Sequence, residues 1–140
     1  MRRERERLRS TPAWAERRRV TERVLAAWSG FYAEERDAVR TWRWCSGEGT
    51  IRLLNPAQQP KTLRMTLYLH PAVPFPLAVR VSGLVEDDLT VVGLRQEFAR
   101  TLVVPPGESV LHFAAGGATL IPPADGRTLM FAVEDFTLRE

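Results

Sequence analysis

The sequence predicts an all-β fold, an antiparallel β-sandwich of the jelly-roll kind, preceded by a basic N-terminal α-helix. Three observations support this prediction. Apolar and polar residues alternate with a period of two through most of the chain after residue 30. Glycine and proline cluster between the short apolar runs. A helical period occurs near the N-terminus, and a chain of 140 residues can bury the core of one such domain.

The helical period belongs to Val20, Val24 and Trp28, which recur at every fourth position. This stripe predicts a helix over residues 12–28. Gly30 follows the last apolar residue, where a left-handed C-cap is favourable. We therefore divide the chain into a basic helical arm, residues 1–29, and a sandwich domain, residues 30–140.

The positive charge of the chain is concentrated in its first 24 residues. They hold nine arginines and four glutamates, a net charge of +5, whereas the whole chain carries +3. Three interpretations of the arm stay open: a solvated helix, a segment that contacts phosphates, and a segment at an anionic membrane surface. Nucleic acid is the partner that we expect least, because arginine enrichment can reflect coding bias.

The strands of the sandwich are predicted from the period-2 runs and the turn residues between them. The predicted strands are residues 39–45, 50–54, 62–69, 77–82, 89–94, 98–104, 110–113 and 128–133. The run Gly47-Glu48-Gly49 is interpreted as a turn between the first two of them.

The last strand contains a conflict of phase. Its apolar residues lie at odd positions up to Val133 and at even positions from Phe136. A regular strand cannot bury both sets, because a shift of one residue reverses its faces. We therefore predict a β-bulge or a strand break at Glu134-Asp135.

The string Trp42-Arg43-Trp44 is the most distinctive candidate for binding. In a strand both indoles share one face, and Arg43 lies on the other. If the shared face is dry, the tryptophans belong to the core. If it is wet, they form an aromatic platform of the kind that stacks on sugar rings or bases, and Arg43 needs a partner.

No residue pattern indicates an enzyme, a metal site or a cofactor. Cys45 is the only cysteine and is interpreted as a small buried thiol, while His70 and His112 fall on predicted wet faces. Carboxylate pairs occur at Glu34-Glu35, Asp87-Asp88 and Glu134-Asp135. Neighbours on a strand point to opposite faces, so none of these pairs serves hydrolysis alone.

Several short strings together resemble a known family. They are Gly30-Phe31-Tyr32, Glu34-Glu35-Arg36, Trp42-Arg43-Trp44-Cys45, Gly49-Thr50-Ile51, Leu54-Asn55-Pro56, Leu102-Val103-Val104-Pro105-Pro106-Gly107 and Asp125-Gly126-Arg127. Residues 30–140 resemble the C-terminal β-sandwich domain of bacterial membrane-embedded envelope proteins, including sulfatase-like and glycosyltransferase-like ones. The resemblance implies a carbohydrate-binding-like sandwich, a non-catalytic accessory role, and a catalytic or membrane part upstream.

Together these features predict a non-catalytic binding or accessory module, with envelope glycan as the leading ligand class. The alternative is an interaction protein whose basic helix docks an acidic partner or a membrane surface. We expect a cytoplasmic location if the chain is complete, and membrane association if it is part of a larger envelope protein. The predicted ligand-binding residues are Trp42, Arg43, Trp44, Asp87, Asp88 and Arg127.

Overall fold

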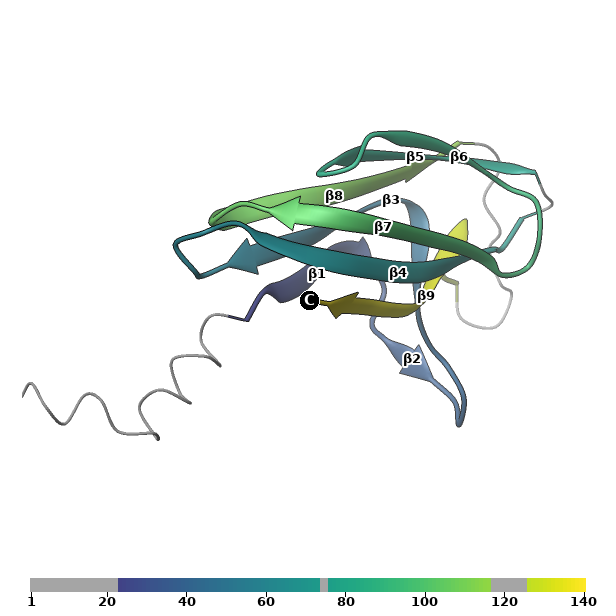
Figure 1. Cartoon of the computed structure of the whole chain (residues 1–140). Helices are drawn as coiled ribbons and strands as arrows, with labels where there is room; N and C mark the ends of the chain where they lie inside the picture. Colours follow the sequence, from purple (N-terminus) through teal and green to yellow (C-terminus); the bar gives the residue numbers. More distant parts are fainter. Residues whose placement is uncertain (1–22, 74–75, 117–125) are drawn as a thin grey trace, which may run out of the picture.

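The alternating pattern folds into antiparallel β-strands, as the computed structural model of residues 23–73, 76–116 and 126–140 shows (Figure 1). The strands are β1 (Leu25–Phe31), β2 (Glu35–Arg36), β3 (Thr41–Asn55), β4 (Lys61–Pro71), β5 (Leu77–Gly83), β6 (Asp87–Val91), β7 (Gln96–Val104), β8 (Gly107–Ala115) and β9 (Phe131–Arg139). All strand pairs within these ranges are antiparallel, so the predicted all-β antiparallel class is confirmed. In those same ranges, no helical segment has both the length and the hydropathy that a bilayer crossing needs.

Two layers form because the long strand β3 takes part in both of them. Its second half pairs with β1 and β8, and β8 continues to β5 and β6. Its first half pairs with β2 and β9, and β9 continues to β4 and β7. In Figure 1, β5, β6 and β8 lie above β4 and β9. Apolar side chains from both layers fill the space between them, as in other β-sandwiches.

The core is built by the alternation that the sequence shows. On β4, the four apolar residues from Leu63 to Leu69 are at most 4% exposed, while the residues between them are exposed or half-buried. Equivalent buried residues come from β5 and β8, such as Val79 and Phe113. The inward face of β4 is therefore apolar and its outward face polar, as predicted.

Gly47-Glu48-Gly49 does not form the predicted turn. Strand β3 runs through these residues without interruption, so the two predicted strands are one. A Cβ atom on Gly49 would lie 2.3 Å from the ring of Phe31. Glycine is thus required here by the close packing of an aromatic ring, which the sequence pattern cannot distinguish from a turn.

The predicted helix is wrong over its last residues, because Leu25–Phe31 form strand β1. Residues 12–22 lie outside the described part of the chain. A spacing of four is also a multiple of two, so Val24 and Trp28 share a face in a strand as they would in a helix. Both side chains pack against the core, and Trp28 meets the rings of Phe31 and Phe136 edge-on.

Gly30 has the left-handed backbone that was predicted, but it is not a helix cap. Its φ is +80°, and it lies at a register shift in the pairing of β1 with β3. A Cβ atom there would lie 2.7 Å from the carbonyl oxygen of Glu48. Both the φ angle and the close approach require glycine at this bulge.

The predicted irregularity at Glu134-Asp135 is confirmed. Asp135 has a φ of +49°, and the pairing of β9 with β4 shifts register between Thr66 and Tyr68. The extra residue reverses the phase of β9. Val133 before the bulge and Phe136 after it therefore both pack on the core.

Candidate functional site

Trp42 and Trp44 lie on the outward face of the layer that contains β9 and β4. Their register partners on β9 are Glu134 and Ala132, and both indoles are half-buried. Both line one open depression of about 290 Å³, which we call the aromatic depression. Its lining residues are Glu35, Asp37, Arg40, Trp42, Trp44, His70, Ala132 and Glu134. The tryptophans are thus neither fully buried core residues nor a freely exposed platform.

A small residue in the middle strand lets two rings meet. Trp44, Ala132 and His70 follow one another in register across β3, β9 and β4. The centroids of the Trp44 and His70 rings are 5.8 Å apart, and Ala132 is 1% exposed. Nδ1 of His70 also lies 2.5 Å from the carbonyl oxygen of Leu94, which holds the imidazole in place.

One rim of the aromatic depression is the turn between β2 and β3. The backbone amides of Val39 and Arg40 donate to Oδ1 of Asp37, at 2.8 and 2.7 Å. These hydrogen bonds lower the pKa of Asp37, because they favour its ionised form. The turn therefore places a fixed carboxylate and the Arg40 side chain beside the tryptophans.

Arg127 is brought to the same rim from the segment before β9. Its guanidinium pairs with the carboxylate of Glu35 on β2 and lies 5.6 Å from the centroid of the Tyr32 ring. The hydroxyl of Tyr32 accepts a hydrogen bond from the amide of Thr128 at 3.2 Å. These contacts attach the segment that begins at residue 127 to β2 and to the residues just before β2.

Arg95 crosses the centre of the face from the connection between β6 and β7. Its Nε donates to Glu134 Oε1 at 3.2 Å, and its Nη2 donates to Asp135 Oδ2 at 2.6 Å. The guanidinium also lies 3.6 Å from the centroid of the Tyr68 ring. Neighbouring carboxylates were expected to point apart, but the bulge at Asp135 turns both toward one guanidinium.

Beyond Arg95, the same outward face holds a second depression of about 460 Å³, which we call the cationic depression. Its lining residues are Arg64, Thr66, Tyr68, Arg95, Asp135, Thr137 and Arg139. Because Tyr68 and His70 lie on one face of β4, the two depressions are parts of one surface. We call this surface the outer face.

Of the predicted binding residues, the structure brings Trp42, Trp44 and Arg127 together and places the other three elsewhere. Arg43 lies on the opposite side of β3, with its guanidinium 4.9 Å from the centroid of the Trp28 ring. That aromatic ring is the partner which a buried arginine was expected to need.

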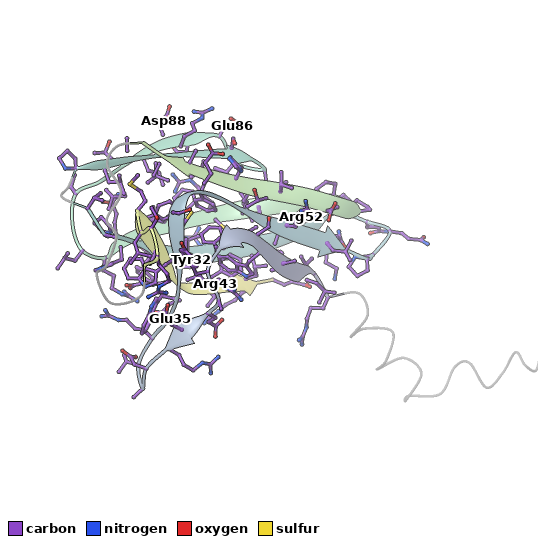
Figure 2. All side chains as sticks on the ribbon, turned by 180° about the vertical axis from the view of Figure 1, so that it is seen from behind. Tyr32, Glu35, Arg43, Arg52, Glu86 and Asp88 are labelled. Carbon is purple, nitrogen blue, oxygen red and sulfur yellow. The ribbon has the colours of Figure 1, made fainter. Side chains whose placement is uncertain are left out.

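Asp87 and Asp88 begin the edge strand β6, which starts two residues before the predicted strand 89–94. Asp87 pairs with Arg100, and Asp88 pairs with Arg80 at 3.1 Å. In Figure 2, Asp88 lies at the top edge of the molecule, whereas Glu35, which lines the aromatic depression, lies in its lower part. These two carboxylates are therefore in ion pairs remote from the aromatic depression.

The candidates for nucleophilic or metal chemistry are separated by the fold. Cys45 is fully buried, and burial raises the pKa of its thiol, which disfavours the reactive thiolate. His112 lies on β8, where it contacts Thr50 and Glu48 and not His70. Across residues 23–73, 76–116 and 126–140, no three His, Cys, Asp or Glu side chains are grouped to hold a metal ion.

Four residues of the outer face were not among the predicted binding residues: Tyr68, His70, Arg95 and Glu134. Tyr68 and His70 carry a usable signal, because they are aromatic rings on the polar face of a strongly alternating strand. Arg95 lies in a loop without periodicity, and the position of Glu134 depends on a long-range strand pairing.

The chain is similar to known proteins in structure, but no protein-family model and no curated protein matches it. It is similar to a family 35 carbohydrate-binding module from Clostridium thermocellum, with 12% identity and a TM-score of 0.46, over 78% of this chain and 90% of that one. A CBM4 structure has 10% identity and a TM-score of 0.47, over 85% and 87% of the two chains. The structure of TmCBM61 in complex with β-1,4-galactotriose has 14% identity and a TM-score of 0.35, over 84% and 88%.

Proposed function

We propose that this protein is a non-catalytic glycan-binding module, and that the aromatic depression is where the glycan binds. The observation that carries this proposal is the position of Trp42 and Trp44, half-buried side by side in an open depression on a polar sheet face. Apolar C–H groups of a sugar ring pack on an indole, while its hydroxyls need hydrogen-bond donors and acceptors around the ring. Asp37, Arg40 and His70 supply such groups at the rim.

The non-catalytic part of the proposal rests on the state of the acidic and nucleophilic groups. Glu35 and Glu134 each form an ion pair with an arginine, so both carboxylates already have a partner within the protein. The Cys45 thiol is buried. The resemblance to envelope-protein domains adds envelope glycan as the class of ligand to be tried first.

The test is a titration of the full chain with neutral and charged envelope polysaccharides, followed by tryptophan fluorescence and calorimetry. We expect saturable binding, with the affinity reduced about thirtyfold or more in Trp44→Ala, since truncation of an aromatic residue at a binding hot spot costs about 2 kcal/mol or more. Leu54→Ala is the matched control, because Leu54 is exposed on the other layer. Both variants are checked for folding by thermal denaturation.

Two results would overturn the proposal. One is the absence of binding to any polysaccharide. The other is equal affinity of the wild type, Trp42→Ala and Trp44→Ala for a polysaccharide that does bind. Binding that is lost only when arginines in residues 1–24 are replaced would instead favour the basic segment as the interaction surface.

A further inference from the structure

The proposed glycan site does not include the cationic depression. It lies on the outer face beside the aromatic depression, with Arg95 between the two. Its composition differs from that of its neighbour, because three of its seven lining residues are arginines. A ligand that covers the whole outer face therefore meets rings at one end and guanidinium groups at the other.

The arrangement of Arg64 and Arg139 is unfavourable for the folded protein alone. They are direct register partners on β4 and β9, and both are exposed. Like charges that face each other across a strand pair are destabilising. In the ranges that the structure describes, neither arginine forms an ion pair that would offset this repulsion.

The other groups in the cationic depression add hydrogen-bond donors and little free negative charge. Thr66 and Thr137 are also register partners, two residues along each strand from Arg64 and Arg139, and each carries a hydroxyl that can donate. Asp135 is the one carboxylate among the residues that line the cationic depression, and both of its oxygens already accept hydrogen bonds. Its Oδ2 accepts from Arg95 at 2.6 Å, and its Oδ1 accepts from the amide of Thr41 at 3.0 Å.

The two depressions can be reached by one extended ligand. The residues from Arg64 to His70 on the outer face span about 20 Å along β4, at roughly 3.3 Å of rise per residue. A chain of sugar rings is long enough to cover this distance. A single small anion is not, so the geometry favours an extended sugar chain that carries an acidic group where it meets the arginines.

We propose that the ligand of the outer face is an anionic polysaccharide. Ring faces pack on Trp42 and Trp44, while an acidic substituent is held by the guanidinium groups of Arg64 and Arg139. A planar carboxylate or a sulfate matches the hydrogen-bonding fork of arginine. This inference rests on the proposed glycan-binding function and names the class of glycan.

The test compares polygalacturonate with the same polymer in its methyl-esterified, uncharged form, and a sulfated polysaccharide forms a third arm. The wild-type full chain is compared with Arg64→Gln/Arg139→Gln. The matched control is Arg2→Gln/Arg3→Gln, which removes the same charge from the basic N-terminal segment. This control separates a defined site from general attraction to a basic chain.

We expect the wild type to prefer the acidic polymer, and Arg64→Gln/Arg139→Gln to bind it about tenfold or more weakly, as for the loss of charged hydrogen bonds. Binding of the methyl-esterified polymer should be unchanged in that variant. The same variant should also unfold at an equal or higher temperature than the wild type, because its like-charge repulsion is relieved. The sulfated arm shows whether the site takes sulfate as well as carboxylate.

Equal weakening in Arg64→Gln/Arg139→Gln and in Arg2→Gln/Arg3→Gln would overturn the inference. So would equal affinity of the wild type for both forms of the polymer. In either case the proposed function stands if Trp44→Ala still loses binding. If no polymer binds the wild type, the proposed function fails and the inference fails with it.

Discussion

The triple contact of Arg95 gives a quantitative test of how the outer face is held together. Its guanidinium bonds to Glu134 and Asp135 and covers Tyr68. The side chains of Arg95 and Glu134 are 31% and 10% exposed, so solvent screens this ion pair only in part. A charged hydrogen bond in such a setting contributes about 1–2 kcal/mol, below the upper range for fully buried pairs.

The other two contacts of Arg95 add less. In the ion pair with Asp135, the Asp135 side chain is 27% exposed. A solvent-exposed ion pair contributes about 0.5 kcal/mol. The stacking of the guanidinium on Tyr68 contributes about 0.5–1 kcal/mol. We therefore expect Arg95→Ala to lower the free energy of unfolding by about 2–3.5 kcal/mol, mostly through Glu134.

The assay is urea denaturation of the full chain followed by fluorescence, with unchanged m-values as the condition for comparison. Arg95→Ala, Glu134→Gln and the double variant form a cycle, whose coupling energy should be about 1–2 kcal/mol. Arg95→Lys is the control that keeps the charge and loses the fork. A loss below about 0.5 kcal/mol in Arg95→Ala, or additive effects in the cycle, would refute this account of the contact.

Three further outcomes follow from the core and the turns. Gly30→Ala should lower the free energy of unfolding by about 1–3 kcal/mol in the same denaturation assay, because a Cβ meets Glu48 and φ is +80°; an unchanged midpoint would contradict this. Cys45 should react with a thiol reagent only when the protein unfolds, and fast labelling of the native protein would refute this. Because burial raises the pKa of its thiol, Cys45 adds stability that is fully present below the thiol pKa of the unfolded chain. That stability is lost as the pH rises through the thiol pKa of the folded protein. Asn55→Ala should cost about 1–3 kcal/mol by thermal or urea unfolding, because Asn55 is 1% exposed and donates to Val104 O at 2.9 Å; a neutral effect would count against a structural role.

The strands were predictable where one face is buried and the other is wet. The alternation on β4 fixed its inward and outward residues, and the change of phase after Val133 located the bulge. The same period of two predicted that the indoles of Trp42 and Trp44 share one face of the strand. These features depend on local patterns, which a single sequence contains.

The features that were not predictable depend on contacts between distant segments. Strand β1 has a spacing that suits both a helix and a strand, and its pairing with β3 decides between them. Gly49 is explained by the Phe31 ring, and Arg95 by carboxylates 39 and 40 positions away. The gathering of Trp44, Ala132 and His70 likewise requires the strand order, which local patterns do not give.

The most direct test of the central claim is an amide and indole NMR titration of the full chain with an acidic oligosaccharide. We predict shifts concentrated on the outer face, with the largest at the indoles of Trp42 and Trp44 and smaller ones at Tyr68, Arg64 and Arg139. The amide resonances of β5 and β6 should not shift. Shifts confined to β5 and β6 or to residues 1–24, or no shifts at saturating ligand, would contradict the assignment of the outer face as the binding surface.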